Sequence, residues 1–258
     1  MRQPQRTEWR IRLIRPGRGI NSATKAMAAE PQSNPNPLIE FHAGGHERFP
    51  APYPAAHNIP EWYKKLAMEV SGPEDQANRT IKRCTPFLDA LGCGYIIPLT
   101  GDITFTTDAQ GNLSYDVEAT ANLIETHGPV QYAGTPFASA LIVKFINLWL
   151  IKTPVGYSTL LVPALNRFHI PFLMLSGVVE TDNYYREIHF PSICQLPRNA
   201  KYLMKRGTPL MQAIPFPRQE WRSVAMEWDN EKRGAMEHQI AANLHLYKDE
   251  HWRKKTYG

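Results

Sequence analysis

The chain has 258 residues, 43% hydrophobic and 21% charged, which is enough for one sizeable domain with appendages. Its 22 prolines favour turns and short strands over a helical bundle, and three cysteines are too few for a disulfide scaffold. The net charge of +5 comes from one segment, because residues 1–26 carry seven basic residues and one acidic residue.

Residues 1–35 form a basic, Pro-rich arm that we expect to be disordered, with Met27 as a second candidate start. An Arg-rich arm can bind nucleic acid, and this stays open as an alternative to a plain leader. Residues 36–83 predict an extended segment with one short helix. The helix is expected over Ile59–Val70, where Trp62, Leu66 and Val70 recur every four residues and would form a buried stripe.

Residues 84–217 predict a mainly β domain. Ile103 and Phe105 alternate with polar residues, and Gly111-Asn112 is typical of a hairpin turn. Turn signals recur about every 8–12 residues, which favours a barrel or a sandwich. Residues 218–258 are charged and contain no proline, so they predict a helical tail that includes the segment "QEWRSVAMEW".

The sequence predicts neither a membrane span nor a metal site. The longest apolar run, Ala140–Ile151, is broken by Lys144 and Asn147 and is shorter than the ~18–20 residues of a membrane span, so we expect no membrane contact. The cysteines lack a CxxC spacing and closely spaced histidines, so we expect no metal site.

Three segments carry a resemblance to a known family. They are "IKTPVGYSTLLVP" (Ile151–Pro163), "GVVETDNYYREI" (Gly177–Ile188) and "MKRGTPLMQAIPFP" (Met204–Pro217). Each resembles a motif of the trimeric dUTPases, and the three follow one another in that family's order. The resemblance covers roughly residues 84–217 and implies a dUTPase-like β-clip barrel. The arrangement is also similar to a phage and bacterial group described as a domain of unknown function.

The resemblance assigns roles to the hairpin residues. Glu180 stands where the family has its catalytic aspartate, Asp182 follows it, and Gly177 would let a base or sugar approach the backbone. The hairpin is one residue longer than in the family, so either Tyr184 or Tyr185 would face the sugar. The alternative is structural: the carboxylates would cap a turn, and the tyrosines would pack across strands.

Three more residues complete the implied ligand site. Asn166 and Arg167 replace the family's phosphate-binding Arg–Ser–Ser, and Gln212 matches the family's glutamine. The family's Gly-rich C-terminal arm has no counterpart. Because phosphoryl transfer needs several charges neutralised at once, these departures predict that dUTPase catalysis is lost.

Three functions follow as hypotheses. The first is a dUTPase-like protein that binds a nucleotide-like ligand or acts as an assembly module, with a self-trimer implied by the resemblance. The second is a divergent nucleotide hydrolase or deaminase with Glu180 as general base, the one case in which Mg²⁺ would be expected. The third is a phage structural or host-interaction protein. The expected location is the host cytoplasm, or the virion if a phage encodes the chain.

Overall fold

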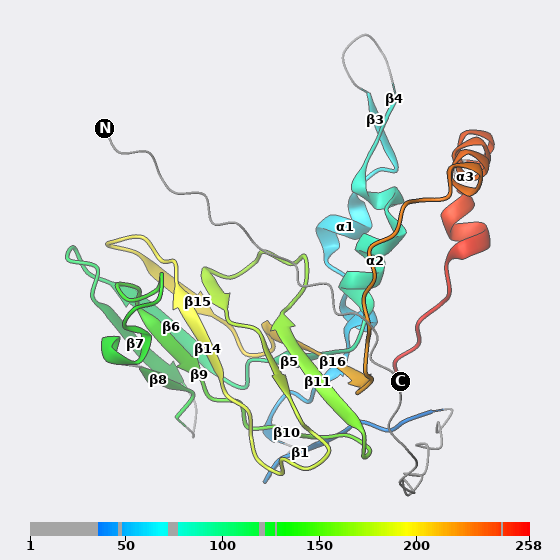
Figure 1. Cartoon of the computed structure of the whole chain (residues 1–258). Coiled ribbons are helices and arrows are strands. Elements are labelled where there is room, and N and C mark those ends of the chain that lie inside the picture. The colour runs from blue at the N-terminus through cyan, green and yellow to red at the C-terminus, as the bar shows by residue number, and fades with distance from the viewer. Residues whose placement is uncertain (1–35, 46–47, 72–76, 119–121, 127, 244) are drawn as a thin grey trace, which may run out of the picture. The chain divides into compact units, whose positions relative to one another are not determined.

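Short antiparallel strands are the main regular secondary structure, in agreement with the alternating pattern of the sequence (Figure 1). The computed structural model describes residues 36–258 except 46–47, 72–76, 119–121, 127 and 244. The N-terminal residues 1–35, which the sequence predicts to be disordered, lie outside the described residues. The described chain belongs to one unit, Pro35–Gly258.

A five-stranded sheet has the strand order β13–β11–β16–β5–β2. Its strands span Gly177–Val179, Tyr157–Pro163, Pro209–Pro217, Tyr95–Pro98 and Tyr53–Pro54. All seven residues of β11 pair with β16, from Tyr157 opposite Pro217 to Pro163 opposite Met211. The other edge of β11 pairs with β13, which opens the hairpin segment that the sequence singled out.

Four smaller sheets complete the β structure of the described residues. One has the order β12–β14–β9–β8, with strands Phe172–Met174, Phe190–Cys194, Ile142–Phe145 and Ile124–Thr126. Another has the order β15–β6–β7, with strands Lys201–Met204, Asp102–Thr107 and Leu113–Glu118. The remaining two are the pairs β1 (Glu40–His42) with β10 (Leu150–Lys152) and β3 (Glu69–Ser71) with β4 (Ala77–Arg79). The mainly β class is confirmed, although the described strands do not close into one continuous barrel.

One large hydrophobic core holds the sheets together. The rings of Phe105, Phe145 and Phe172 meet at its centre, with the Phe105 and Phe172 centroids 4.5 Å apart. These rings come from three strands in two sheets, β6, β9 and β12, so their burial fixes the sheets against each other.

Helices lie outside this core. They are α1 (Glu61–Lys65), α2 (Thr85–Gly92) and α3 (Asn230–Ala242), with 3₁₀ turns η2 (Ala55–Asn58), η4 (Ile81–Arg83) and η5 (Pro129–Tyr132) and a π-helical turn η6 (Tyr247–His251). No helix among the described residues is long and apolar enough to cross a membrane.

The predicted helices differ from the observed ones. Over Ile59–Val70 only five residues are helical, and Val70 lies in β3. Trp62 and Val70 are about half exposed, and the buried side chain is Tyr63, which stacks on Phe87 with ring centroids 5.7 Å apart. The stripe prediction was therefore wrong, because a helix this short is shaped by its tertiary neighbours rather than by its period.

The chain after β16 also departs from expectation. Residues 218–229, of which 219–228 were predicted as a helix, are extended and exposed, and α3 starts only at Asn230. Conversely, the region 84–217, predicted as a mainly β domain, opens with the helix α2, whose first turn holds Pro86. Both differences concern segments of eight to twelve residues, where local propensity is a weak guide.

Candidate functional site

The turn before β11 is fastened to the hairpin after β13. The Gly156 backbone N–H donates to the Asp182 carboxylate at 2.9 Å, and Arg218 donates to the same carboxylate through both of its terminal nitrogens. Arg218 also donates to the Tyr157 carbonyl at 2.8 Å. One carboxylate therefore joins the turn, the hairpin and the chain segment that leaves β16.

The charges of this clamp reinforce each other. The Asp182 side chain is only 5% exposed, and the hydrogen bond from Arg218 is the main reason why its pKa lies below the usual value, with Gly156 adding to the effect. The same pair raises the pKa of Arg218. Both groups therefore remain charged at neutral pH, which favours a bidentate ion pair.

Three buried threonines repeat this connection inside the protein. The Thr181 hydroxyl lies 2.7 Å from that of Thr153 and 2.8 Å from that of Thr159, and all three side chains are buried. The Thr153 N–H also donates to the Thr181 carbonyl at 3.2 Å. The hairpin and the turn are thus held by two separate polar networks, which fixes where Tyr157 and Pro154 lie.

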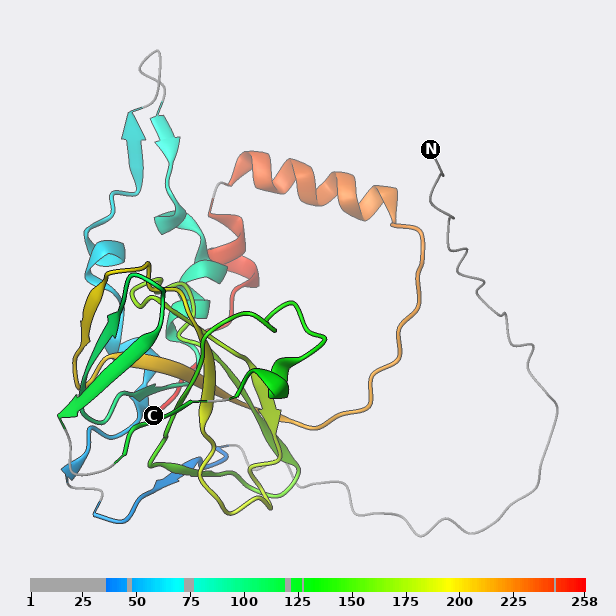
Figure 2. The same ribbon diagram turned by 90° about the vertical axis from the view of Figure 1, so that its left-hand side faces the viewer.

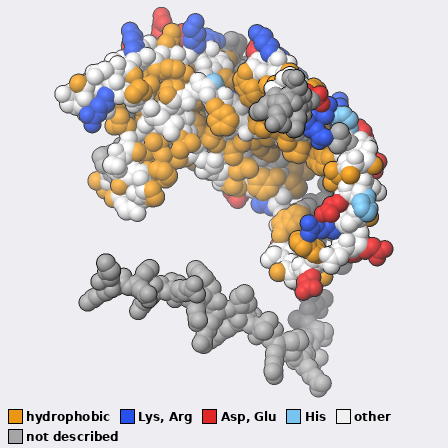
Figure 3. Space-filling model, turned by 90° about the horizontal axis from the view of Figure 1, so that it is seen from above, with side chains coloured by type: hydrophobic (Ala, Val, Ile, Leu, Met, Phe, Trp, Pro, Cys, Tyr) orange, Lys and Arg blue, Asp and Glu red, His pale blue; other side chains and the backbone are white. Residues whose placement is uncertain are grey.

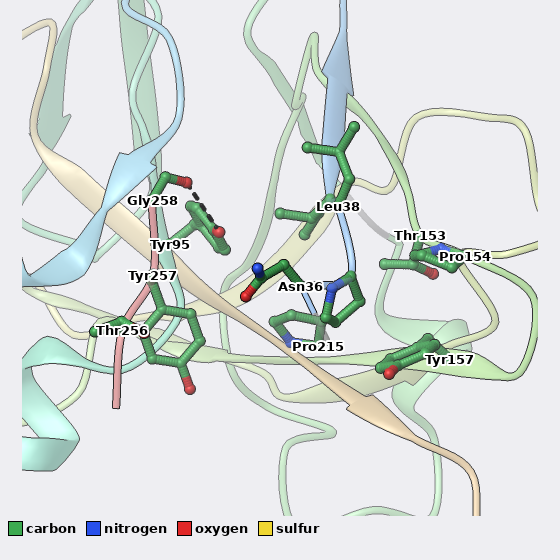
Figure 4. Close-up of a pocket in the computed structure, with 12 residues that line it drawn as sticks. Asn36, Leu38, Tyr95, Thr153, Pro154, Tyr157, Pro215, Thr256, Tyr257 and Gly258 are labelled. Carbon is green, nitrogen blue, oxygen red and sulfur yellow. Dashed lines mark hydrogen bonds between the residues drawn. The ribbon is translucent and has the colours of Figure 1, made fainter. Parts of the chain in front are cut away.

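A cavity of about 540 Å³ opens beside this turn (Figure 4). The Thr153–Tyr157 turn forms one side and the C-terminal residues the other, with Asn36 between them. The lining residues are Asn36, Pro37, Leu38, Ile39, Tyr95, Thr153, Pro154, Tyr157, Pro215, Thr256, Tyr257 and Gly258.

Two tyrosines form one corner of the cavity. The Tyr95 hydroxyl donates to the Gly258 carbonyl at 3.2 Å, and the Tyr257 ring meets the Tyr95 ring edge-on with centroids 5.8 Å apart (Figure 4). Burial raises the pKa of both phenols, so both stay neutral and able to donate a hydrogen bond. None of the lining residues that the structure describes has a charged side chain. The cavity therefore offers aromatic rings, hydroxyls and one amide.

The sequence-predicted hairpin residues lie together but outside this lining. The Glu180 carbonyl accepts hydrogen bonds from the N–H groups of Asn183 and Tyr184, at 3.3 and 3.0 Å, which closes the turn. Tyr184 and Tyr185 are 49% and 70% exposed, and Tyr185 touches His42 edge-on. Asp182 is committed to the clamp described above.

Gly177 opens β13 and is exposed. A β-carbon built on Gly177 would have no atom within 4 Å, so the position is open to solvent. There is therefore room for a ligand beside Gly177. No neighbouring atom of the chain requires a glycine at this position.

The other three predicted residues lie at the opposite end of β11. Gln212 is fully buried: its amide nitrogen donates to the Ala90 carbonyl at 3.0 Å, and its oxygen accepts from the Leu165 N–H at 3.0 Å. Arg167 is 6% exposed and donates to the carbonyls of Leu91, at 3.1 Å, and Asn58.

Asn166 completes this second group. It occupies the tight turn after β11 with φ of 55°, a backbone conformation that asparagine tolerates better than most residues. Gly177 pairs with Leu161 and Gln212 with Val162, so this glycine lies near the second group, whereas Glu180, Asp182, Tyr184 and Tyr185 lie beyond the other end of β11. The eight predicted residues are thus divided along this strand. In one chain they do not converge on a single cleft.

Sequence reasoning missed Tyr95, Tyr257 and Arg218. Tyr157 belongs to the motif Ile151–Pro163, so the sequence did draw attention to this residue, although not to the cavity beside it. Tyr257 and Arg218 had none, because each meets its partners across long stretches of chain: Tyr257 packs on Tyr95, and Arg218 pairs with Asp182.

Comparison with known proteins gives structures but no sequence relatives. No family model matches the chain, and no curated protein matches it. The dUTPase of Staphylococcus bacteriophage 80alpha is 9% identical, and the match covers 75% of this chain and 98% of that chain with a TM-score of 0.33. A mutant of that enzyme with dUpNHpp is 11% identical, covering 54% and 78%, with a TM-score of 0.30.

A mutant dUTPase from phage phi11 of S. aureus, whose structure concerns the coordination of a structural Mg(II) ion, is 11% identical. That match covers 53% of this chain and 84% of that chain, with a TM-score of 0.29. These structures represent the superfamily that the sequence motifs resemble. Because the TM-scores are low, the function proposed next depends on the residues of this chain alone.

Proposed function

We propose that this chain binds a planar, uncharged ligand of the nucleobase type in the tyrosine-lined cavity, without dUTPase catalysis. The observation that carries the proposal is the lining, which combines Tyr95, Tyr157 and Tyr257 with hydroxyl and amide groups and, over residues 36–258 as described, includes no charged side chain. A heterocyclic base has an apolar face and a polar edge, and aromatic walls with a few hydrogen-bonding groups match both.

The charge distribution supports a base rather than a triphosphate. Phosphate oxygens are held by cations or by converging N–H donors. Arg218 lies next to Tyr157, yet its guanidinium is engaged by Asp182 and by the Tyr157 carbonyl. Phosphates would therefore have to lie outside the cavity and add little affinity.

Calorimetry and thermal melting with a graded ligand series test this proposal. The series is uracil, thymine, deoxyuridine, dUMP and a non-hydrolysable dUTP analogue. We expect the base or the nucleoside to raise the melting temperature by mass action, with no gain in affinity from the phosphates. Affinity that rises with each added phosphate, or no binding across the series, would reject the cavity as a base site.

A pair of tyrosine variants locates the site. Tyr257→Ala removes a ring from the cavity, whereas Tyr185→Ala removes an exposed ring from the hairpin that the sequence favoured. We expect binding to be lost in the first variant and retained in the second. The reverse result would move the site to the hairpin, and retention in both would refute the role of the cavity.

A second function is favoured by a separate observation, and we propose it alongside the first: self-assembly. Trp221, Val224 and Trp228 are 85%, 79% and 68% exposed in the extended segment after β16. Three large apolar side chains exposed within eight residues mark a contact surface. Size-exclusion chromatography with light scattering should give a mass of at least twice 29.4 kDa, at an integer multiple of that value. A monomer at tens of micromolar would contradict assembly.

A further inference from the structure

The extended segment between β16 and α3, residues 219–228 and here named the arm, runs over the surface of its own chain without packing on the sheets. Its Trp228 ring lies under the guanidinium of Arg233 in α3, 4.1 Å from the ring centroid. Its two ends are fixed, because the Arg218 N–H donates to the Gly156 carbonyl and the Asp229 carboxylate caps α3. Between these points every residue is exposed, and no hydrogen bond of the arm occurs within the described part of the chain. Figure 2 shows the arm running clear of the sheets, in orange.

The arm has the sequence of an amphipathic helix although it is extended. Trp221, Val224, Ala225 and Trp228 recur at i, i+3, i+4 and i+7, which would align them in one stripe on a helix. An isolated helix of ten residues is marginal in water, so the arm needs a surface to fold against. The pattern is that of a segment that becomes helical in an apolar groove.

A groove of this kind lies on another part of the protein. It has a volume of about 690 Å³ and is bounded by α1, the β3–β4 pair, the start of α2 and η6. Its apolar wall includes Met68, Leu88 and Tyr247, which are 53%, 40% and 49% exposed. Seen from above, the molecule exposes many hydrophobic side chains (Figure 3). None of the arm residues lines the groove.

The rim of the groove is basic. Five of its lining residues are lysine or arginine, and none is aspartate or glutamate. Arg83 uses one terminal nitrogen to pair with Glu69 at 2.8 Å, but its Nε is buried without a hydrogen-bond partner. Arg79 and Lys248 have no acidic partner among the described residues. Lys64 is also paired, with Glu61 at 2.7 Å. The groove thus combines an apolar floor with unpaired positive charge at Arg79, Lys82 and Lys248 among the described residues.

We propose that the arm of one copy folds as a helix into this groove on a second copy of the chain. The tryptophan stripe matches the apolar floor, and Glu220 and Glu227, one position before each tryptophan, flank the stripe and face the basic rim. This inference rests on the self-assembly proposed above and adds the contact that makes it.

Oligomeric state measured by light scattering tests the contact on full-length protein. Val224→Asp places a charge on the stripe, and we expect it to give monomers. Met226→Asp is the matched control, since Met226 is 82% exposed on the same arm but lies off the stripe. We expect this variant to assemble like the wild type. Circular dichroism and thermal melting confirm that both variants are folded.

A second experiment tests whether the arm occupies this groove. It also tests whether that groove belongs to the same chain or to a second copy. Ala225→Cys puts a thiol on the stripe, and Cys84 is an exposed thiol that lines the groove. Mild oxidation should yield a disulfide-linked dimer on a non-reducing gel, and the dimer should be absent when Cys84→Ser is added.

The outcomes separate the two proposals. A monomeric wild type would reject self-assembly itself, and with it this contact. An oligomer that survives Val224→Asp would leave assembly standing and reject the arm as its cause. A disulfide that forms within one chain would place the arm in its own groove and overturn the second copy as partner. Equal loss of assembly in Met226→Asp would reject the helical stripe.

Discussion

The Asp182 carboxylate accepts hydrogen bonds from both terminal nitrogens of Arg218 while it also accepts the Gly156 N–H. These residues come from the hairpin after β13, the segment that leaves β16 and the turn before β11. A motif that resembles a substrate-binding hairpin thus also serves as a structural joint, at the place where the arm begins.

Asp182→Asn should destabilise the protein in a pH-dependent way. At pH 7 we expect the free energy of unfolding to fall by about 1–3 kcal/mol, because charged hydrogen bonds are lost at a nearly buried site. The folded pKa of Asp182 is lowered, so its contribution is complete above the unfolded pKa of about 4 and is lost as pH falls through the folded pKa.

Urea denaturation of wild type and Asp182→Asn at several pH values between 7 and 2 measures this effect. The difference between the two proteins should be largest near neutral pH and shrink in acid. A difference that stays constant over the whole range would show that the charge of Asp182 contributes nothing to stability.

Gln212→Ala should lower the free energy of unfolding by about 1–3 kcal/mol, because it leaves the Leu165 N–H and the Ala90 carbonyl without their buried partner. Gln219→Ala is the control, since this side chain lies exposed in the arm and should change stability by less than about 0.5 kcal/mol. Chemical denaturation of both variants gives the comparison. Unchanged stability in Gln212→Ala would favour the ligand role that the sequence assigned to it.

Substitution by alanine should destabilise the protein at Gly94 but not at Gly177. Gly94 has φ of 64°, and a β-carbon there would lie 2.2 Å from the Ala213 carbonyl oxygen. The left-handed backbone alone costs about 1–2 kcal/mol, and the clash adds to it. Gly177→Ala meets open space and should be nearly neutral for stability. Melting temperatures test both, and ligand titration of Gly177→Ala tests whether a ligand approaches this backbone.

Incubation with dUTP and Mg²⁺ addresses the role of Glu180. Its carboxylate is one methylene longer than the aspartate of the family it resembles, and a misplacement of about 1 Å can cost two orders of magnitude in rate. We expect no release of pyrophosphate above a blank without protein. Turnover by the wild type that is lost in Glu180→Gln would overturn this expectation and establish Glu180 as the general base.

Local patterns predicted the elements that depend on nearby residues. Gly111-Asn112 indicated a hairpin, and β6 and β7 pair there with Thr107 opposite Leu113. The alternation around Ile103 and Phe105 placed both residues in the core. These features follow from turn chemistry and from the two-residue period of a strand, which act within a few residues.

Roles that depend on distant partners were out of reach of such patterns. Arg167 was a candidate in place of the family's phosphate-binding residues and Gln212 matched the family's glutamine, yet in the structure each is buried and bonded to backbone near α2. Their partners lie more than 40 residues away in the sequence, for Gln212 as far as Ala90. Nothing local distinguishes a polar side chain that holds a ligand from one that holds a helix end.

The sequence by itself determined the mainly β class, the order of the motif segments and the positions of the tight turns, since backbone sterics and side-chain alternation act over short distances. Only the tertiary structure decided that the tyrosine cavity forms beside the turn before β11 and that the arm after β16 stays extended. Both depend on contacts between residues far apart in the chain, such as Tyr95 with Tyr257, and burial and charge pairing exist only once those residues meet.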